Sequence, residues 1–335
     1  MGATAVPYRP LLQINFGSPA NATDETLGKV TQAYVHVGNW HISHVVVERG
    51  LLVKKRLFLP VDLVTAARVD GIRFSLTVEE LTEKSQAPKG SELLAMREHL
   101  PIWSGTTKIG TLSQLFFDAA TGQLSHLVAH RHAIAGGEVL LGVDQLERLA
   151  ADRLEVKVSA REFAILPHYR PDPELAEAVR ESLWNYPRLR VDLHAIQVYA
   201  QCNDVWLQGY VSSEMNRRLA ENQARLVPEV RNLYNELIAD NDLAMEIAAA
   251  LAKSEVTRGL PIGVYPNLGD VHLRGVVPTE EARKAAEAIA SEAPDIKAVH
   301  NEIVISPNAE FLPALAGVNG REDIVPGKEE TPDEA

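Results

Sequence analysis

Two sets of internal repeats constrain the fold of this chain more than any other feature of its sequence. A shift of 66 places residues 205–211 (Val-Trp-Leu-Gln-Gly-Tyr-Val) on residues 271–277 (Val-His-Leu-Arg-Gly-Val-Val). From 205 to 237 this alignment needs no gap, and 12 of 33 positions are identical. A shift of 82 aligns residues 27–81 with 109–163, again without a gap, with 11 of 55 positions identical. The chain is therefore predicted to contain two different modules, each present twice.

The C-terminal repeats have the hydrophobic pattern of an αββαβ unit. Leu175, Val179 and Leu183 recur at helical spacing, and residues 196–200 and 205–211 then alternate as strands do. Short polar turns separate these strands and predict a hairpin. A second helix is expected to begin at Ser213 or Thr279, and the closing strand is expected over 230–238 or 296–305.

The N-terminal repeats consist of short alternating strands, expected over 30–37, 42–47, 57–59 and 72–78 and at equivalent positions 82 residues later. This spacing is typical of small β-barrels with antiparallel strands. The predicted fold is multidomain, with two antiparallel β-barrels followed by two α+β units. The expected boundaries are 8–83 and 92–166 for the barrels, 171–239 and 240–306 for the α+β units, and 307–335 for an acidic, disordered tail.

Motifs within the repeats resemble two known families. Leu27-Gly28-Lys29-Val30 with Leu59-Pro60-Val61-Asp62, and their counterparts at 109–112 and 141–144, are similar to PRC-barrel domains. The second counterpart lacks the proline. The Val-x-Leu-x-Gly-x-Val strands around Gly209 and Gly275, each followed by a helix and an Asn-containing strand, resemble BON domains. The PRC resemblance implies an adaptor role. The BON resemblance implies phospholipid or envelope attachment, although the chain lacks the export signal typical of exported BON proteins.

Charge and composition exclude several classes of protein. The net charge of −12 argues against nucleic-acid binding, which needs a basic surface. Cys202 is the only cysteine, so the chain has no internal disulfide. The first residues do not form a secretory signal, and the apolar stretches are shorter than the roughly 20 residues of a spanning helix. We therefore predict a cytoplasmic bacterial protein without a transmembrane segment, whose membrane contact would be peripheral, at the inner face.

No catalytic, metal or cofactor site is predicted. His126, His130 and His132 share one strand face, but four strand residues separate His126 from His130 by about 13 Å, too far to share one ion. Ser43-His44 and Ser125-His126 are adjacent on strands, and their side chains are expected to point to opposite faces. The sequence contains no P-loop, GxGxxG, HExxH or GxSxG motif.

A few residues are candidates for structural or contact roles. The motif glycines Gly28, Gly110, Gly209 and Gly275 are predicted to be structural, and a bulge or tight packing is favoured over ligand approach at Gly209 and Gly275. Trp206, Arg217 and Arg218 form a candidate contact surface. Two alternatives remain open: the arginines belong to a solvated face neutralised by nearby glutamates, and Trp206 packs against a neighbouring domain.

These observations predict a non-enzymatic binding or scaffold protein. The PRC-like barrels would bind a protein partner or each other, and the BON-like pair would contact a phospholipid surface or another macromolecule. The alternative is an RNA- or ribosome-associated factor acting through the barrels.

Overall fold

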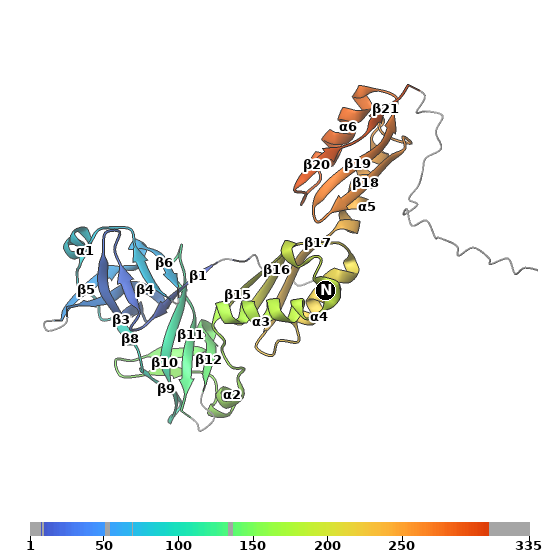
Figure 1. Cartoon of the computed structure of the whole chain (residues 1–335). Coiled ribbons are helices and arrows are strands. Elements are labelled where there is room, and N and C mark those ends of the chain that lie inside the picture. Colours follow the sequence, from blue (N-terminus) through green and yellow to red (C-terminus); the bar gives the residue numbers. More distant parts are fainter. Residues whose placement is uncertain (1–7, 9, 51–53, 69, 133–136, 308–335) are drawn as a thin grey trace, which may run out of the picture. The chain divides into compact units, whose positions relative to one another are not determined.

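A computed structural model describes residues 8, 10–50, 54–68, 70–132 and 137–307, so the predicted acidic tail lies outside the described residues from 308 onward (Figure 1). The contacts between residues divide the chain into two compact units. One comprises residues 1–187, 197–207 and 220–236; the other comprises the remainder. Among the described residues, no helix is both long enough and apolar enough to cross a membrane.

The first N-terminal repeat forms one sheet and a short helix, with strand order β5-β4-β3-β2-β7-β6. Its elements are β2 (Pro19–Asn21), β3 (Thr26–His36), β4 (His41–Arg49), β5 (Lys55–Pro60), β6 (Val64–Arg68), β7 (Gly71–Phe74) and α1 (Val78–Lys84). A single 3₁₀ turn, η1 (Val61–Leu63), connects β5 to β6.

The second N-terminal repeat reproduces this plan, with strand order β12-β11-β10-β9-β14-β13. Its elements are β9 (Pro101–Ser104), β10 (Thr107–Asp118), β11 (Leu124–Arg131), β12 (Glu138–Gly142), η2 (Val143–Gln145), β13 (Leu146–Leu149), β14 (Leu154–Val156) and α2 (Ala160–Ile165). The offset of 82 also holds in detail: Thr77 and Glu80 form a capping box at α1, and Ser159 and Glu162 form one at α2. The repeat read from the sequence is therefore a structural repeat.

Two features differ from the predicted antiparallel barrels. Among the described residues, neither sheet closes, because β5 and β6, or β12 and β13, remain at opposite ends of the strand order. In addition, β2 pairs with β7, and β9 with β14, in parallel. The β6–β7 hairpin returns the chain to β2 in the direction in which β2 itself runs, which is the reason for the parallel pair.

The two N-terminal repeats exchange their first strands. β1 (Leu11–Asn15) precedes the first repeat, yet it pairs with β10 of the second, with Leu11 opposite Asp118 (Figure 1). β8 (Leu93–Arg97) precedes the second repeat and pairs with β3 of the first, with Leu93 opposite His36. Both registers agree with the 82-residue offset. The boundaries 8–83 and 92–166 therefore do not coincide with the pairing, since each range contributes one strand to the other sheet.

A left-handed backbone residue turns each exchanged strand away from its own repeat. Gly17 has φ 82° and His99, its equivalent, has φ 60°. The Gly17 amide donates to the Val30 carbonyl at 2.7 Å, and the His99 amide donates to that of Leu112 at 2.9 Å. Without the turn at Gly17, β1 and β2 would form one continuous strand along β3. The part of the β3 edge that β1 would then occupy is taken by β8 instead. Glycine adopts this conformation without strain, whereas His99 needs the surrounding hydrogen bonds to hold it.

One hydrophobic core serves both N-terminal repeats. Ile14 on β1 and Met96 on β8 are fully buried, and they belong to one continuous cluster with residues of both sheets, such as Val45 and Leu127. The β3–β4 and β10–β11 turns also meet, because the Ile42 amide donates to the Gly122 carbonyl at 2.9 Å. The pair therefore folds as one body rather than as two independent modules.

The C-terminal repeats have the predicted αββαβ order. The first consists of α3 (Asp172–Trp184), β15 (Ile196–Gln201), β16 (Asp204–Val211), α4 (Glu214–Ala224) and β17 (Asn232–Ala239), with sheet order β15-β16-β17. The second consists of α5 (Asp240–Lys253), β18 (Ile262–Asn267), β19 (Asp270–Val277), α6 (Glu280–Ser291), β20 (Ala298–Asn301) and β21 (Val304–Ile305), with β20 and β21 both parallel to β19. The single closing strand expected over 296–305 is thus interrupted at Glu302 and Ile303.

Two-residue turns close both C-terminal hairpins. Cys202 and Asn203 have φ 52° and 64°, and Leu268 and Gly269 have φ 50° and 90°. Positive φ at both positions is the mark of a type I′ turn, whose twist matches that of paired strands. A carboxylate at the start of the first helix caps each turn: Asp172 accepts from the Cys202 amide at 2.8 Å, and Asp240 accepts from the amide of Leu268 at 2.8 Å.

Candidate binding surfaces

The outward face of each C-terminal sheet carries three rings at equivalent positions. In the second copy, Tyr265 on β18 is opposite His272 on β19, which is opposite His300 on β20. The offset of 66 maps these residues onto Tyr199, Trp206 and Tyr234. We call Tyr199, Trp206 and Tyr234 the first ring row, and Tyr265, His272 and His300 the second ring row.

The first ring row is covered by the ring of Tyr8. The Trp206 and Tyr234 rings stack with centroids 4.9 Å apart. Tyr8 stacks on Tyr199 at 5.0 Å and meets Trp206 edge-on at 5.3 Å. Trp206 is only 4% exposed, so it does not offer the exposed contact surface considered from the sequence, and it packs against another part of the chain.

The second ring row remains open. Tyr265 is 52% exposed and His300 is also exposed. The imidazoles of His272 and His300 stack at 4.7 Å. Glu302 lies beside them, with a carboxylate oxygen 2.7 Å from His272 Nδ1 and the other accepting from Arg274 Nε at 2.7 Å. These hydrogen bonds, that of Arg274 first, lower the pKa of Glu302.

The predicted arginine surface is largely engaged by acidic side chains. Arg217 pairs with Glu214 at 2.6 Å and with Asp242 at 3.4 Å, and Arg218 pairs with Glu214 at 2.9 Å. The pKa of Glu214 is lowered, although burial opposes the effect of the two guanidinium groups. This arrangement agrees with the neutralised, solvated face that the sequence left open as an alternative.

The four motif glycines lie where another segment of backbone passes closely. A Cβ on Gly209 would be 2.0 Å from the Ala195 carbonyl oxygen, and one on Gly275 would be 2.0 Å from that of Pro261. A Cβ on Gly28 would meet the Glu48 carbonyl at 2.2 Å, and one on Gly110 would meet that of His130 at 2.5 Å. At each position it is backbone, not space for a ligand, that excludes a side chain.

The expectation that Ser125 and His126 cannot meet is wrong. Ser125 Oγ lies 2.9 Å from His126 Nδ1. Phe116 pairs with His126 and Phe117 with Leu124, so Ser125 is the extra residue of a β-bulge, and a bulge breaks the strict alternation of side chains. In the first repeat the bulged Ser43 bonds instead to the Tyr34 carbonyl.

The titratable groups near this bulge are poorly suited to chemistry. Burial, followed by the charge of Arg231, lowers the pKa of His126 to about 4. Burial also raises the pKa of the Cys202 thiol, which is 2% exposed, so burial disfavours both the thiolate of Cys202 and the imidazolium of His126. His130 and His132 are exposed, and within the described ranges no group of three or more His, Cys, Asp or Glu is placed to hold a metal ion.

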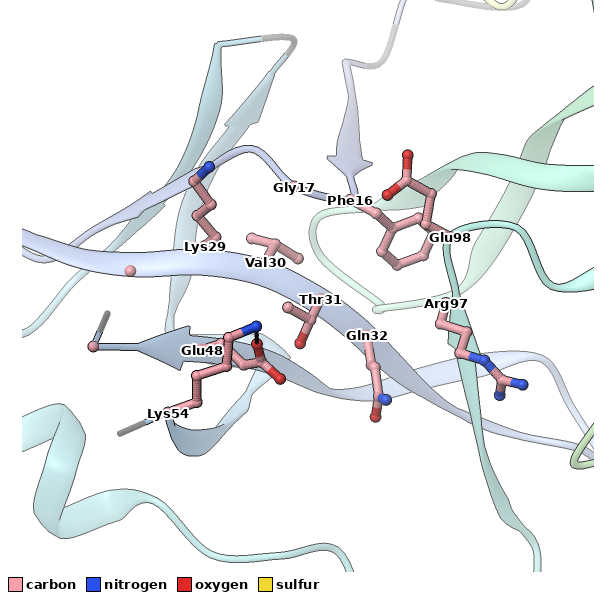
Figure 2. A pocket seen from close by; sticks show the side chains of 12 residues that line it. Phe16, Gly17, Lys29, Val30, Thr31, Gln32, Glu48, Lys54, Arg97 and Glu98 are labelled. Atoms are coloured by element: carbon pink, nitrogen blue, oxygen red, sulfur yellow. Dashed lines mark ion pairs between the residues drawn. The ribbon is translucent and has the colours of Figure 1, made fainter. Parts of the chain in front are cut away.

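Two cavities in the first unit were not foreseen from the sequence. One, of about 500 Å³, is lined by residues that include Ser125, His126, Trp206 and Tyr234. The other, of about 630 Å³, lies where β8 reaches β3. Figure 2 shows Lys29, Lys54 and Arg97 around it, with the Lys54–Glu48 ion pair at 3.2 Å. Because Glu48 and Glu98 offset two of these three cations, this cavity has little preference for an anion.

Sequence reasoning missed Tyr8, Tyr199, Tyr234, Tyr265 and His300 as surface residues. The signal that could have found them is the same 66-residue offset that pairs Trp206 with His272. When the same offset is applied to the two strands that flank the Trp206 or His272 strand, it places rings at all three outward positions in both copies. The covering of the first row by Tyr8 depends on a contact between distant segments, which the repeat does not encode.

Comparison with known proteins identifies the C-terminal half. The BON domain family model matches residues 171–240 and 239–307, which are two tandem copies. This match confirms the BON resemblance, and the PRC-barrel resemblance of the N-terminal repeats stays a prediction. No curated protein matches the sequence.

Similar solved structures include two of CdsD, a structural protein of the type III secretion system of Chlamydia trachomatis. Its C-terminal domain is 18% identical, with a TM-score of 0.34, over 41% of this chain and 68% of that one. The second structure is 12% identical, with a TM-score of 0.22, over 40% and 92%. Scores this low carry no argument about function.

Proposed function

We propose that the chain is a non-enzymatic binding or scaffold protein, in which the N-terminal pair is the rigid base and the BON pair contacts a partner protein. The adaptor role implied by the PRC-barrel resemblance is part of this proposal. The strand exchange supports it, since a shared core makes the base a single body.

The distribution of exposed apolar side chains carries the proposal. Among the described residues, nine of the ten large hydrophobic side chains that are exposed fall within the BON matches, and only Ile165 lies outside them. The nine are Trp184, Val191, Met215, Leu226, Met245, Val256, Tyr265, Val304 and Ile305. Apolar exposure that is concentrated in one part of a chain favours contact with another macromolecule there.

The state of the titratable groups supports a binding role over catalysis. Among the described residues, the Cys202 thiol and the Tyr169 phenol are buried with raised pKa values, and His126 has its pKa lowered to about 4. A general base needs a pKa near the working pH. Burial raises the pKa of Asp172 to about 7, but its carboxylate accepts from the Cys202 amide as a turn cap.

Protein contact is favoured over lipid or RNA contact. Four arginines of the first BON copy, Arg217, Arg218, Arg225 and Arg231, pair with glutamate or aspartate, which reduces the basic surface available to headgroups or phosphates. The net charge of −12 acts in the same direction.

The test combines vesicle sedimentation with site-specific photo-cross-linking in the full chain. Photoreactive residues are placed at Met215, Met245 or Val256 in the BON pair and, as a control, at exposed Lys108 in the base. We expect one protein partner to cross-link from the BON positions and not from Lys108. Equal labelling from both regions, or sedimentation that increases with the anionic lipid content of the vesicles, would contradict protein contact through the BON pair.

A further inference from the structure

The two ring rows provide an internal comparison, because the same sheet face is covered in one BON copy and open in the other. In the first copy, Tyr8 lies over Tyr199 with an interplanar angle of 25° and meets Trp206 at 65°. Both are favourable arrangements for aromatic pairs. The first ring row is thus a surface on which an aromatic side chain, that of Tyr8, binds.

The covering residue, Tyr8, lies shortly before strand β1. Three residues after Tyr8, the Leu11 amide donates to Gln201 Oε1 at 2.8 Å, at the end of β15, and Leu11 begins β1. The first ring row is therefore covered by the aromatic ring of a chain segment that also donates a backbone hydrogen bond to the end of β15.

The second ring row keeps the main element of this surface. Tyr265 occupies the position of Tyr199, and its ring lies across Gly263, where a Cβ would be 2.6 Å from the ring. Arg274 lies 5.6 Å from the centre of the Tyr265 ring. No ring of the described chain other than the row itself stacks on these residues, and Tyr265 stays 52% exposed.

The differences between the rows define what the second row would accept. His272 and His300 replace Trp206 and Tyr234, so the platform is still planar but can also donate or accept hydrogen bonds. Arg274 is committed to Glu302 at 2.7 Å, which disfavours a phosphate or a lipid headgroup as the ligand. We infer that the second ring row, Tyr265–His272–His300, is a binding site for a peptide segment of a partner protein that carries an aromatic side chain. The inference rests on the proposed function and names the kind of partner.

The test uses, as a probe, a peptide with the chain's own sequence around Tyr8. A synthetic peptide of residues 5–14 (Ala-Val-Pro-Tyr-Arg-Pro-Leu-Leu-Gln-Ile) is titrated into the full-length protein, and binding is followed by calorimetry and by the ¹H–¹³C signals of the histidine rings. We expect shifts of the His272 and His300 ring signals. Tyr265→Ala, or a peptide with alanine for tyrosine, should weaken binding about two- to twelvefold, which is the fold-change expected for the loss of one aromatic pair.

Matched variants separate the ring contact from a folding defect. Tyr265→Phe retains the ring and should bind as the unaltered chain does. Lys284→Ala truncates an exposed side chain of α6 in the same repeat, outside the row and outside the proposed partner contact, and should have no effect. Absence of binding at millimolar peptide, or binding that survives Tyr265→Ala or the alanine peptide, would overturn the inference. The proposed function is tested separately, because its cross-linking positions lie outside the second ring row.

Discussion

Substitution of Met96 by alanine tests whether the exchanged strands unite the two N-terminal repeats. Met96 is fully buried on β8, opposite Ala33 of β3. It belongs to the second repeat by sequence and to the first repeat's sheet by pairing. Truncation of a fully buried methionine to alanine costs about 2–5 kcal/mol, so we expect a loss of about 3 kcal/mol in the free energy of unfolding.

The assay needs one reporter in each repeat. Trp40 lies in the turn between β3 and β4, and Trp103 lies on β9. In two versions of the chain, each keeping one of these tryptophans and replacing the other three by phenylalanine, urea unfolding is followed by fluorescence. Because the repeats share one core, Met96→Ala should lower the stability reported by Trp40 and by Trp103 equally.

The controls make the result decisive. Met96→Leu conserves volume and should cost less than about 1.5 kcal/mol. Ile14→Ala, the equivalent change on β1, should again move both reporters. Ile247→Ala lies in the separate core of the second BON copy and should move neither. If Met96→Ala shifts the Trp40 transition and leaves that of Trp103 in place, the repeats unfold independently and the argument from strand exchange is refuted.

Three further substitutions test other parts of the fold. Gly275→Ala should destabilise the chain by more than about 1 kcal/mol, because its Cβ would clash with the Pro261 carbonyl; Gly38→Ala, with only ordinary contacts, serves as control in the same thermal melts. The folded pKa of Asp172, about 7 against 3.8, means that its contribution to stability falls as pH rises from about 4 to 7. Asp172→Asn should therefore be more stabilising at pH 8 than at pH 4 in urea unfolding, by up to about 4 kcal/mol for a shift of this size, and equal effects at both pH values would count against this reasoning. The pH dependence that His126 contributes to stability has the opposite sign. Its pKa is about 4 in the folded chain against 6.5 in the unfolded chain, so stability falls as pH drops from 6.5 to 4. His126→Gln should flatten that part of the stability–pH curve, and an unchanged slope would show that His126 is not its source.

The αββαβ order could be predicted because local signals agreed in both copies. The stripe of Leu175, Val179 and Leu183 is buried on α3 as its spacing indicated, and Thr279, where the second helix was expected to begin, is the N-cap of α6. Cys202 and Asn203 form the expected hairpin turn. Both have positive φ, as a two-residue type I′ turn requires.

What could not be predicted depends on contacts between distant segments. The apolar pattern of residues 11–15 indicates a strand but not its partner, because either β3 or β10 would pair with it equally well by composition. The Ser125–His126 contact depends on a bulge that no residue type at those positions announces. The covering of Trp206 by Tyr8 joins residues 198 positions apart, and only the arrangement of the first unit brings them together.

The strand exchange also sets an order of events during synthesis. β1 emerges from the ribosome first, but its partner β10 ends at Asp118, more than a hundred residues later. At about 5–20 residues per second, β1 waits on the order of 5–20 s for its partner. Until β8 is made, at Leu93–Arg97, the edge of β3 that β8 will cover is also free to pair with strands of other nascent chains. The nascent chain should therefore be most dependent on chaperones before residue 118 is made, and a stalled ribosome in this interval would release an aggregation-prone fragment.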